Sequence, residues 1–351
     1  MAGAAFRIGD RRVGPGEPVY LIAEAGVNHN GDLGMARRLV DAAASCRADA
    51  VKFQTFHADA LATPEAGRAA YQRRAVGDGS QLDMLRALEL GAEDHRRLQE
   101  HAARRGLEFL STPFDEASVD LLAGLGLRAF KVGSGDMDNH PLLRRIASHG
   151  RPVLLSTGMA DLAEVKAAAG VLEETRTPYA LLHCTSAYPA RAADLNLRAM
   201  AALADVCPVV GYSDHTEGVW SGPAAVALGA SILEKHLTLD RSLPGPDHAA
   251  SLEPAEFAAY VDGARNAQAA LGDGVKRPTE DEAEVARVAR KSVVTARPVR
   301  AGRPLAREDL SVKRPGTGIR PPRLEDLVGL RPRADLPADH VLRWEDLEGQ
   351  G

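Results

Sequence analysis

Polar, charged or hydroxyl side chains stand at the ends of eight short apolar runs in the first two thirds of the chain. In chain order they are Glu24, Lys52 with Gln54, Thr112, Lys131 with Ser134 and Asp136, Ser156, Thr185 with Tyr188, Ser213 with His215, and Glu234 with His236. Burying charged groups beside apolar runs costs free energy unless a ligand or a partner compensates them. The pattern therefore predicts a ligand site rather than packing.

The types of these side chains favour an anionic ligand. Lys52 and Lys131 offer point charges. Hydroxyl donors would be supplied by Thr112, Ser134, Ser156 and Ser213. Such a set suits a small, multiply charged phosphate or carboxylate. Either lysine alone could equally form a structural ion pair with a neighbouring acid, but four converging hydroxyls favour the anion site.

Two histidines and two glutamates could supply further chemistry. His215 and His236 end the seventh and eighth runs, and two imidazoles on neighbouring strand ends can bind a divalent metal with positions open for substrate. A single histidine at a strand end is more often a hydrogen-bonded structural residue. Glu24 and Glu234 are candidate proton-transfer groups, because a carboxylate in a dehydrated site can be tuned towards neutral pKa. Salt bridges to Lys52 or Lys235 are the structural alternative for them.

The elements that must position these residues are strands covered on both faces, because the runs are nearly continuous in apolar residues. They are 19–25, 50–56, 108–114, 129–134, 152–158, 180–186, 208–214 and 231–236. Amphipathic helical patterns separate them, which predicts a (β/α)8 TIM barrel with its site at the carboxyl ends of the strands. An open doubly wound sheet is the competing fold, but no G-x-G-x-x-G motif follows any run.

The chain divides into three parts by composition. Residues 1–271 are expected to hold an N-terminal hairpin, with its turn near Gly9-Asp10, and the catalytic barrel. Residues 272–286 are rich in Gly, Pro and charge and are expected to form a linker. Residues 287–351 contain short β-type runs at 292–296 and 309–314 between Pro and Gly turns, which predicts a small, mostly β domain.

The bulk composition argues against several classes of protein. A hydrophobic content of 45% and a charged content of 26% are ordinary for a globular protein. Residues 287–343 carry 14 Lys/Arg against 6 Asp/Glu, yet no aromatic residues interleave with them, so nucleic acid is not the expected partner. The N-terminus lacks a signal-peptide core, and no apolar stretch reaches the length of a membrane span. Three cysteines without metal or redox spacing indicate a reducing cytoplasm.

Ordered segments of the chain resemble the sialic acid synthase (N-acetylneuraminate synthase) family. They are AEAGVNHNGD (23–32), VKFQTF (51–56), STPFD (111–115), KVGSGDMDN (131–139), LSTGM (155–159), LLHCTSAYPA (181–190), GYSDHTEG (211–218), EKHLTLD (234–240), LPGPDHAASLEP (243–254) and KRPGTGI (313–319). The resemblance implies a barrel followed by an antifreeze-like SAF domain of β-clip fold. It also implies a homodimer in which each small domain caps the active site of its partner.

The resemblance further implies a role for each candidate residue. His215 and His236 would be ligands of Mn²⁺, with Mg²⁺ or Co²⁺ as other metals, and Glu24 and Glu234 would be the catalytic carboxylates. Phosphoenolpyruvate would be held by Lys52, Thr112, Lys131, Ser134, Ser156 and Ser213. The sugar would be faced by Gln54, Asp136, Tyr188, Asp247 and, from the other subunit, Arg314.

The implied reaction joins phosphoenolpyruvate, an N-acylated amino sugar and water into a nonulosonate and phosphate, with N-acetylmannosamine as the first acceptor considered. Asp136 stands where some members have Glu, Ser186 stands where some have Asn, and Arg73-Arg74 replace a segment that often carries Asn. These departures leave open a 6-deoxy-diacetamido sugar that leads to legionaminic or pseudaminic acid. Two other interpretations are a barrel enzyme that condenses a phosphorylated sugar and a non-catalytic carbohydrate-binding protein.

Overall fold

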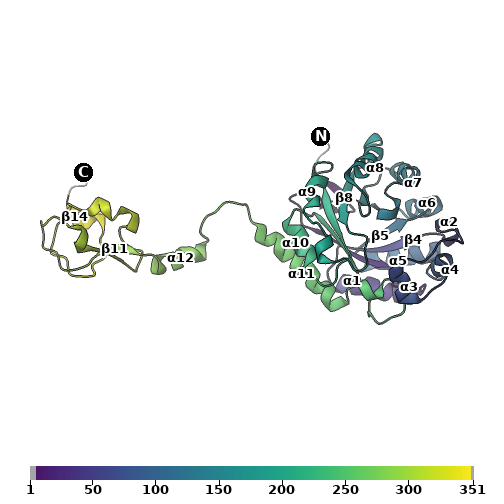
Figure 1. The fold of residues 1–351 in the computed structure, drawn as a ribbon, viewed down its shortest axis with the longest axis horizontal. Helices are drawn as coiled ribbons and strands as arrows, with labels where there is room; N and C mark the ends of the chain where they lie inside the picture. Colours follow the sequence, from purple (N-terminus) through teal and green to yellow (C-terminus); the bar gives the residue numbers. More distant parts are fainter. Residues whose placement is uncertain (1–4, 349–351) are drawn as a thin grey trace. The chain divides into compact units, whose positions relative to one another are not determined.

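The computed structural model describes residues 5–348, which form two compact units that divide between Gly272 and Asp273 (Figure 1). The first unit carries all eight apolar runs identified in the sequence. The second holds the short β-type runs.

The first unit is built on one sheet of eight parallel strands. They are β3 Tyr20–Gly26, β4 Ala50–Thr55, β5 Glu108–Pro113, β6 Phe130–Val132, β7 Val153–Ser156, β8 Tyr179–Cys184, β9 Val210–Asp214 and β10 Ile232–His236. The order across the sheet is β5-β4-β3-β10-β9-β8-β7-β6, and β5 and β6 at its two ends are also in contact. The sheet therefore closes into a barrel, and the prediction of a TIM barrel is confirmed.

Helices connect successive strands and cover the outside of the barrel (Figure 1). They are α1 Leu33–Ser45, α5 Ala92–Arg104, α6 Glu116–Gly124, α7 His140–Ala147, α8 Leu162–Glu174, α9 Ala199–Ala204, α10 Ser221–Ala227 and α11 Pro254–Leu271. Side-chain caps start several of them: Asp32 accepts from the Met35 amide and Asp115 accepts from the Ser118 amide. Leu271, at the last turn of α11, is 52% exposed.

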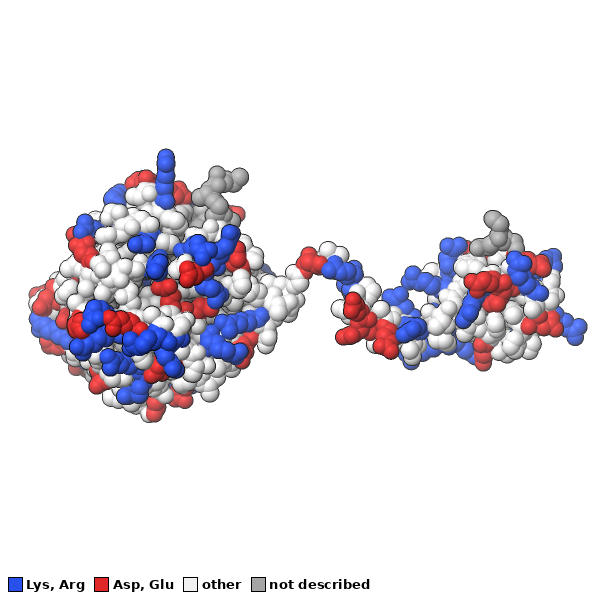
Figure 2. All heavy atoms as spheres, turned by 180° about the vertical axis from the view of Figure 1, so that it is seen from behind, with Lys and Arg blue, Asp and Glu red and all other residues white. Residues whose placement is uncertain are grey.

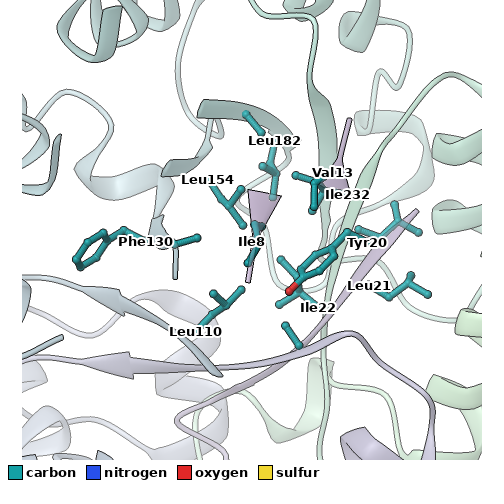
Figure 3. Packing of buried hydrophobic residues seen from close by; sticks show 14 of the residues in the cluster. Ile8, Val13, Tyr20, Leu21, Ile22, Leu110, Phe130, Leu154, Leu182 and Ile232 are labelled. Atoms are coloured by element: carbon teal, nitrogen blue, oxygen red, sulfur yellow. The ribbon is translucent and has the colours of Figure 1, made fainter. Parts of the chain in front are cut away.

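A hairpin closes the amino-terminal end of the barrel. Strands β1 Phe6–Ile8 and β2 Arg11–Val13 pair antiparallel, and the turn at Gly9 has φ +57°, as expected from the sequence. A Cβ at Gly9 would lie 2.4 Å from Oε2 of Glu108, the first residue of β5, so a larger residue would displace that carboxylate and would be strained at this positive φ. Figure 3 shows Ile8 among Leu110, Leu154 and other barrel residues, so the hairpin extends the core below the strands.

Truncation of the hairpin's buried anchor tests this arrangement. Ile8 is 1% exposed, so Ile8→Ala should lower the free energy of unfolding by about 2–5 kcal/mol through lost burial and the cavity that remains. Urea unfolding of the purified variant measures the loss. A change under 1 kcal/mol would mean that the hairpin contributes little to the core.

The second unit begins with a helix in the stretch that was expected to be a linker. Helix α12 Glu280–Ala289 starts at a capping box, in which Thr279 accepts from the Glu282 amide and Glu282 accepts from the Thr279 amide. Seven of the ten residues of this helix lie within residues 272–286, so the second half of the predicted linker is helical. The T-x-x-E capping signature starts a helix here although Gly and Pro residues precede it.

The rest of the second unit is a small β domain with its own core. Strands β11 Ser292–Thr295 and β12 Leu310–Lys313 pair antiparallel, as do β13 Arg331–Pro332 and β14 Leu347–Glu348. The core includes Val293, Leu305, Leu327 and Leu342. Short 3₁₀ turns and loops, rather than long helices, join the strands, as the sequence indicated.

Charge is mixed over the surface of the described residues. On the faces seen in Figure 2, Lys and Arg side chains lie among Asp and Glu side chains on each unit. Between residues 5 and 348, no helix is both long enough and apolar enough to cross a membrane.

Candidate active site

The carboxyl ends of the barrel strands surround a cavity of about 400 Å³. Most residues singled out in the sequence line it. They are Glu24, Lys52, Gln54, Thr112, Lys131, Ser134, Ser156, Tyr188, Ser213, His215, Glu234, His236 and Asp247. The parallel register explains the convergence: Glu24 pairs with Lys52, Gln54 with Thr112, and Ser213 with Glu234 on neighbouring strands.

Four buried charges form an alternating chain across the floor of this cavity. Lys52 Nζ lies 2.7 Å from Glu24 Oε2 and 3.8 Å from Glu234 Oε2. Lys131 Nζ lies 3.4 Å from Glu234 Oε1. All four side chains are at most 6% exposed. The cluster therefore holds two cations and two anions away from bulk water.

The two carboxyl groups differ in their surroundings and in their pKa. Burial raises the pKa of Glu24 to about 7, and the nearby charge of Lys52 only partly offsets it. Burial would also raise the pKa of Glu234, but Lys131 and Lys52 more than offset that effect, and its pKa falls below the ordinary value. Glu234 therefore stays ionised near neutral pH, whereas Glu24 can exchange a proton there.

Hydroxyl groups complete the polar floor. Lys52 Nζ donates to Thr112 Oγ1 at 3.0 Å, and Lys131 Nζ donates to Ser156 Oγ at 2.7 Å. Ser213 Oγ donates to Glu234 Oε1 at 2.8 Å. Ser134 Oγ accepts from the Gly158 amide at 3.0 Å and donates to Cys184 Sγ at 3.5 Å, a weak bond that an anion could replace. Ammonium and hydroxyl donors thus converge as an anion site requires.

The two imidazoles lie side by side at one edge of the cavity, with ring centroids 5.7 Å apart. His215 Nδ1 donates to the Thr185 carbonyl at 2.8 Å, so Nε2, which lies 3.1 Å from Tyr188 Oη, is the nitrogen that could bind a metal. His236 Nδ1 is buried without a hydrogen-bond partner and lies 4.0 Å from Asp247 Oδ2. Burial lowers the pKa of His236 well below its usual value, so this ring stays neutral, as a metal ligand must.

These observations fit a divalent cation held by the two imidazoles and completed by substrate and water. Among residues 5–348, no group of three or more His, Cys, Asp or Glu side chains is arranged to hold a metal by itself. Two protein nitrogens with open positions would suit a catalytic ion rather than a closed structural one.

Two residues assigned to the sugar lie outside the cavity lining. Asp136 belongs to a short 3₁₀ turn, Ser134–Asp136, and its Oδ1 accepts from Asn139 Nδ2 at 3.1 Å. Arg314 belongs to the second unit, where its Nε donates to the Ala289 carbonyl at 3.0 Å. Salt bridges to Lys52 or Lys235 were the structural alternative for the two glutamates, and the ion pair of Glu24 with Lys52 is present. Lys235 instead pairs with Asp214, at 3.1 Å.

Sequence reasoning missed one wall of the cavity. The long connection between β4 and α5 contains α2 Ala58–Leu61, α3 Ala70–Val76 and α4 Gln81–Arg86. From it, Tyr71 stacks on Tyr188 with ring centroids 4.9 Å apart. Apolar lining comes from Val27, Met84, Leu85, Leu88 and Phe114. The unusual length of this connection was the available signal, because βα loops of a barrel build its site.

The fold and the site together define a (β/α)8-barrel enzyme with a buried anion site beside an imidazole pair. Residues 39–276 match the model of the NeuB family, and residues 290–348 match that of the SAF domain. The chain belongs to the NeuB family. The family and the C-terminal SAF domain that the sequence segments predicted are thereby confirmed.

Similar proteins agree over nearly the full length. The chain is 46% identical to the N,N'-diacetyllegionaminic acid synthase of Legionella pneumophila, over 94% of each chain. It is 44% identical to the enzyme of the same name from Campylobacter jejuni, over 92% of this chain and 98% of the relative. A solved structure of N-acetylneuraminic acid synthetase from Leptospira borgpetersenii is 34% identical with a TM-score of 0.72, covering 80% of this chain and 94% of that one.

Proposed function

We propose that this enzyme condenses phosphoenolpyruvate with an open-chain N-acylated amino sugar and water, giving a nine-carbon sugar acid and phosphate. The observation that carries the proposal is the buried chain Glu24–Lys52–Glu234–Lys131, ringed by hydroxyls and flanked by two imidazoles in one cavity. The names of the similar enzymes support the same reaction type.

In this proposal the phosphate and carboxylate of phosphoenolpyruvate bind the ammonium groups of Lys52 and Lys131. Hydroxyl donors from Thr112, Ser134, Ser156 and Ser213 would complete its binding. The anionic substrate would compensate the two lysines beyond what the two glutamates already supply, which favours binding in a site shielded from water.

A divalent cation, with Mn²⁺ as the first candidate, would be held by His215 and His236 and would polarise the aldehyde of the acceptor as a Lewis acid. Burial keeps the His236 ring neutral, and the bond from His215 Nδ1 to the Thr185 carbonyl leaves Nε2 as the lone-pair nitrogen of the neutral His215 ring. Asp247, whose pKa burial raises to about 6, would hold the acceptor beside them with Gln54 and Tyr188.

The remaining chemistry is placed on the carboxylates and lysines. The C3 carbon of phosphoenolpyruvate forms a bond to the aldehyde carbon, and positive character develops at C2. Water adds at C2 and gives one proton to Glu24, which passes it to the oxygen of the former aldehyde. The tetrahedral intermediate then collapses: its C2–OH becomes C2=O, the C2–O bond to phosphate breaks, and the hydroxyl proton leaves with the phosphate. The ionised Glu234 would stabilise the positive character and hold both lysines in place.

For the acceptor we propose a 6-deoxy-diacetamido sugar of the legionaminic type in preference to N-acetylmannosamine. The apolar wall formed by Val27, Met84, Leu85, Leu88 and Phe114 suits a methyl group better than a hydroxymethyl group. Among the described residues of the first unit that line the cavity, Lys52 and Lys131 are the only Lys or Arg side chains, which disfavours an acceptor with its own phosphate.

The proposal extends to the second unit. We place Arg314 of a partner subunit over the acyl group of the sugar, in a homodimer whose SAF domains cap the opposite active sites. Asp136 would reach the sugar after rotation away from Asn139. Sedimentation tests whether the protein is a dimer. The cap is tested by Arg314→Ala, which should lose turnover. Mixing it with a second variant that is inactive in the barrel should restore turnover, because the mixed dimer has one site with an intact barrel and an intact cap.

The test of the reaction offers the purified protein phosphoenolpyruvate, Mn²⁺ and a panel of amino sugars. The panel contains N-acetylmannosamine, its 6-phosphate and 2,4-diacetamido-6-deoxy hexoses. Phosphate release gives the rate and mass spectrometry identifies the product. Phosphate release dependent on a diacetamido sugar supports the proposal, and none with any sugar overturns it.

The pH dependence follows from Glu24. As a base it must be ionised, so kcat/KM should rise with pH through about 7, the pKa that burial gives this carboxyl. The pKa of Glu24 in the folded protein lies above its ordinary value. Glu24 therefore contributes to the free energy of unfolding at low pH, and this contribution falls as the pH rises from about 4.5 to about 7. A rate profile flat between pH 6 and 8 would contradict the assignment.

The apolar wall predicts a change in acceptor preference. Leu85→Asn places an amide where the wall would face the methyl of a 6-deoxy sugar. The ratio of kcat/KM for the diacetamido sugar to that for N-acetylmannosamine should fall about 10-fold. Arg86→Gln, on the exposed side of the same helix, is the control and should leave the ratio unchanged. An unaltered ratio in Leu85→Asn would remove the wall from acceptor recognition.

A further inference from the structure

A second buried charge cluster lies immediately behind the cavity and takes no part in the chemistry proposed above. Asp214 and Lys235 are each 1% exposed, and Lys235 Nζ lies 3.1 Å from Asp214 Oδ1. Neither side chain lines the cavity. They stand opposite each other in the register of β9 and β10.

The position of this pair along the strands is its most informative property. Successive residues of a strand point to opposite faces, so Asp214 separates Ser213 from His215, and Lys235 separates Glu234 from His236. The four flanking side chains enter the cavity. The pair therefore joins the backs of the two strand ends that carry both imidazoles and one of the carboxylates.

Further bonds fix the pair in place. Asp214 Oδ1 accepts from the amide and the hydroxyl of Thr216, at 2.9 and 2.8 Å, and Oδ2 accepts from Ser221 Oγ at 2.6 Å. Lys235 Nζ donates to the Thr216 carbonyl at 2.5 Å and lies 5.7 Å from the ring centroid of Tyr260 on α11. Thr216 and Ser221 are buried as well.

Stability alone does not account for such a cluster. Removing charges from water is costly, and well-packed neutral side chains of similar volume often serve a core equally well. A fully bonded buried network does, however, restrict the backbone to one arrangement. Here the restricted backbone is the segment whose alternate side chains form the metal and anion sites.

We propose that Asp214 and Lys235 are positioning residues, which hold the ends of β9 and β10 so that His215 and His236 keep the spacing a divalent cation needs. Thr216 and Ser221 act with them, and Ser213 and Glu234 are fixed by the same backbone. The inference rests on the proposed metal site at His215 and His236. Outer groups that orient metal ligands typically change metal affinity by about 10–100-fold.

The test removes both charges while keeping their volumes. The double variant Asp214→Asn/Lys235→Met should fold, but should bind Co²⁺ about 10–100-fold more weakly and with an altered d–d absorption spectrum. Its Kd for phosphoenolpyruvate should also rise, because Ser213 and Glu234 move with the backbone. Titration of the purified protein with Co²⁺ alone, then with phosphoenolpyruvate alone, gives both readouts without turnover.

The matched control is Asp49→Asn at the opposite end of the barrel. Asp49 also accepts a strand amide, that of Leu21 at 2.9 Å, and pairs with Arg11 at 2.5 Å, but lies before β4 and away from the cavity. It should lose stability and keep the Co²⁺ affinity and spectrum. Equal losses of affinity in both variants would show a purely structural role and overturn the inference.

A milder variant keeps the inference testable if the double variant does not fold. Ser221→Ala removes one bond to Asp214 from the helix side, and a weaker Co²⁺ complex with a shifted spectrum is expected. Wild-type affinity and spectrum in Ser221→Ala would overturn the proposal. Failure of the wild-type protein itself to bind Co²⁺ would refute the metal site first, which separates the two proposals.

Discussion

Glu24→Gln should lower kcat by about 10²–10⁴-fold, the usual contribution of a positioned general base. Among the four buried charges of the cavity floor, Glu24 is the group that burial brings to a pKa of about 7. Glutamine has the same shape and can still accept from Lys52, but it cannot take a proton from water. Because the change falls on the chemical step, the Kd for phosphoenolpyruvate should change far less than kcat.

The matched control is Glu108→Gln. Glu108 begins β5 at the amino-terminal end of the barrel, and burial raises the pKa of its carboxyl as well. It should retain the kcat of the wild-type enzyme. In Glu24→Gln the rise of the rate with pH through about 7 should also disappear. Near-normal turnover in Glu24→Gln would remove Glu24 from the base role.

The part of the site predicted from the sequence is the part carried by strands. Their periodicity fixes which residues face inward and the closed sheet brings all carboxyl ends together, so Lys52 and Lys131 could be expected at one cavity although 79 residues apart. The same periodicity could have excluded a bond between Glu234 and Lys235. Adjacent strand residues point to opposite faces, and Lys235 accordingly pairs with Asp214 behind the cavity.

What the sequence could not supply lies on connections. Tyr71 reaches Tyr188 because α3 folds back over the mouth of the barrel, and no local periodicity specifies such a tertiary contact. Helix α12 could have been predicted, because Thr279 and Glu282 form a capping box, but the glycines and the proline just before it favoured a linker. Local signals predict elements, whereas the packing of loops depends on the rest of the fold.

Lys131→Met should lower kcat/KM for phosphoenolpyruvate by about 10²–10³-fold. Lys131 Nζ contacts Glu234 Oε1 and Ser156 Oγ at 3.4 and 2.7 Å and is 3% exposed at the side chain, so its charge acts where water screens little. In binding, truncating one partner of a buried, hydrogen-bonded charge pair typically costs about 2–5 kcal/mol, and 1.4 kcal/mol corresponds to a factor of ten. The apoprotein should also unfold at lower urea concentration, because Glu234 keeps only Lys52.

Lys166→Met on the exposed face of α8 removes a lysine from the same barrel without touching the cavity, and should leave both quantities unchanged. Lys131→Arg separates charge from shape: it retains the cation but replaces a compact ammonium by a planar fork, so it should recover stability more than catalysis. If Lys131→Met bound phosphoenolpyruvate with wild-type affinity, this lysine would serve only to neutralise Glu234. The anion site would then reduce to Lys52 and the hydroxyls, too few donors to hold both a phosphate and a carboxylate.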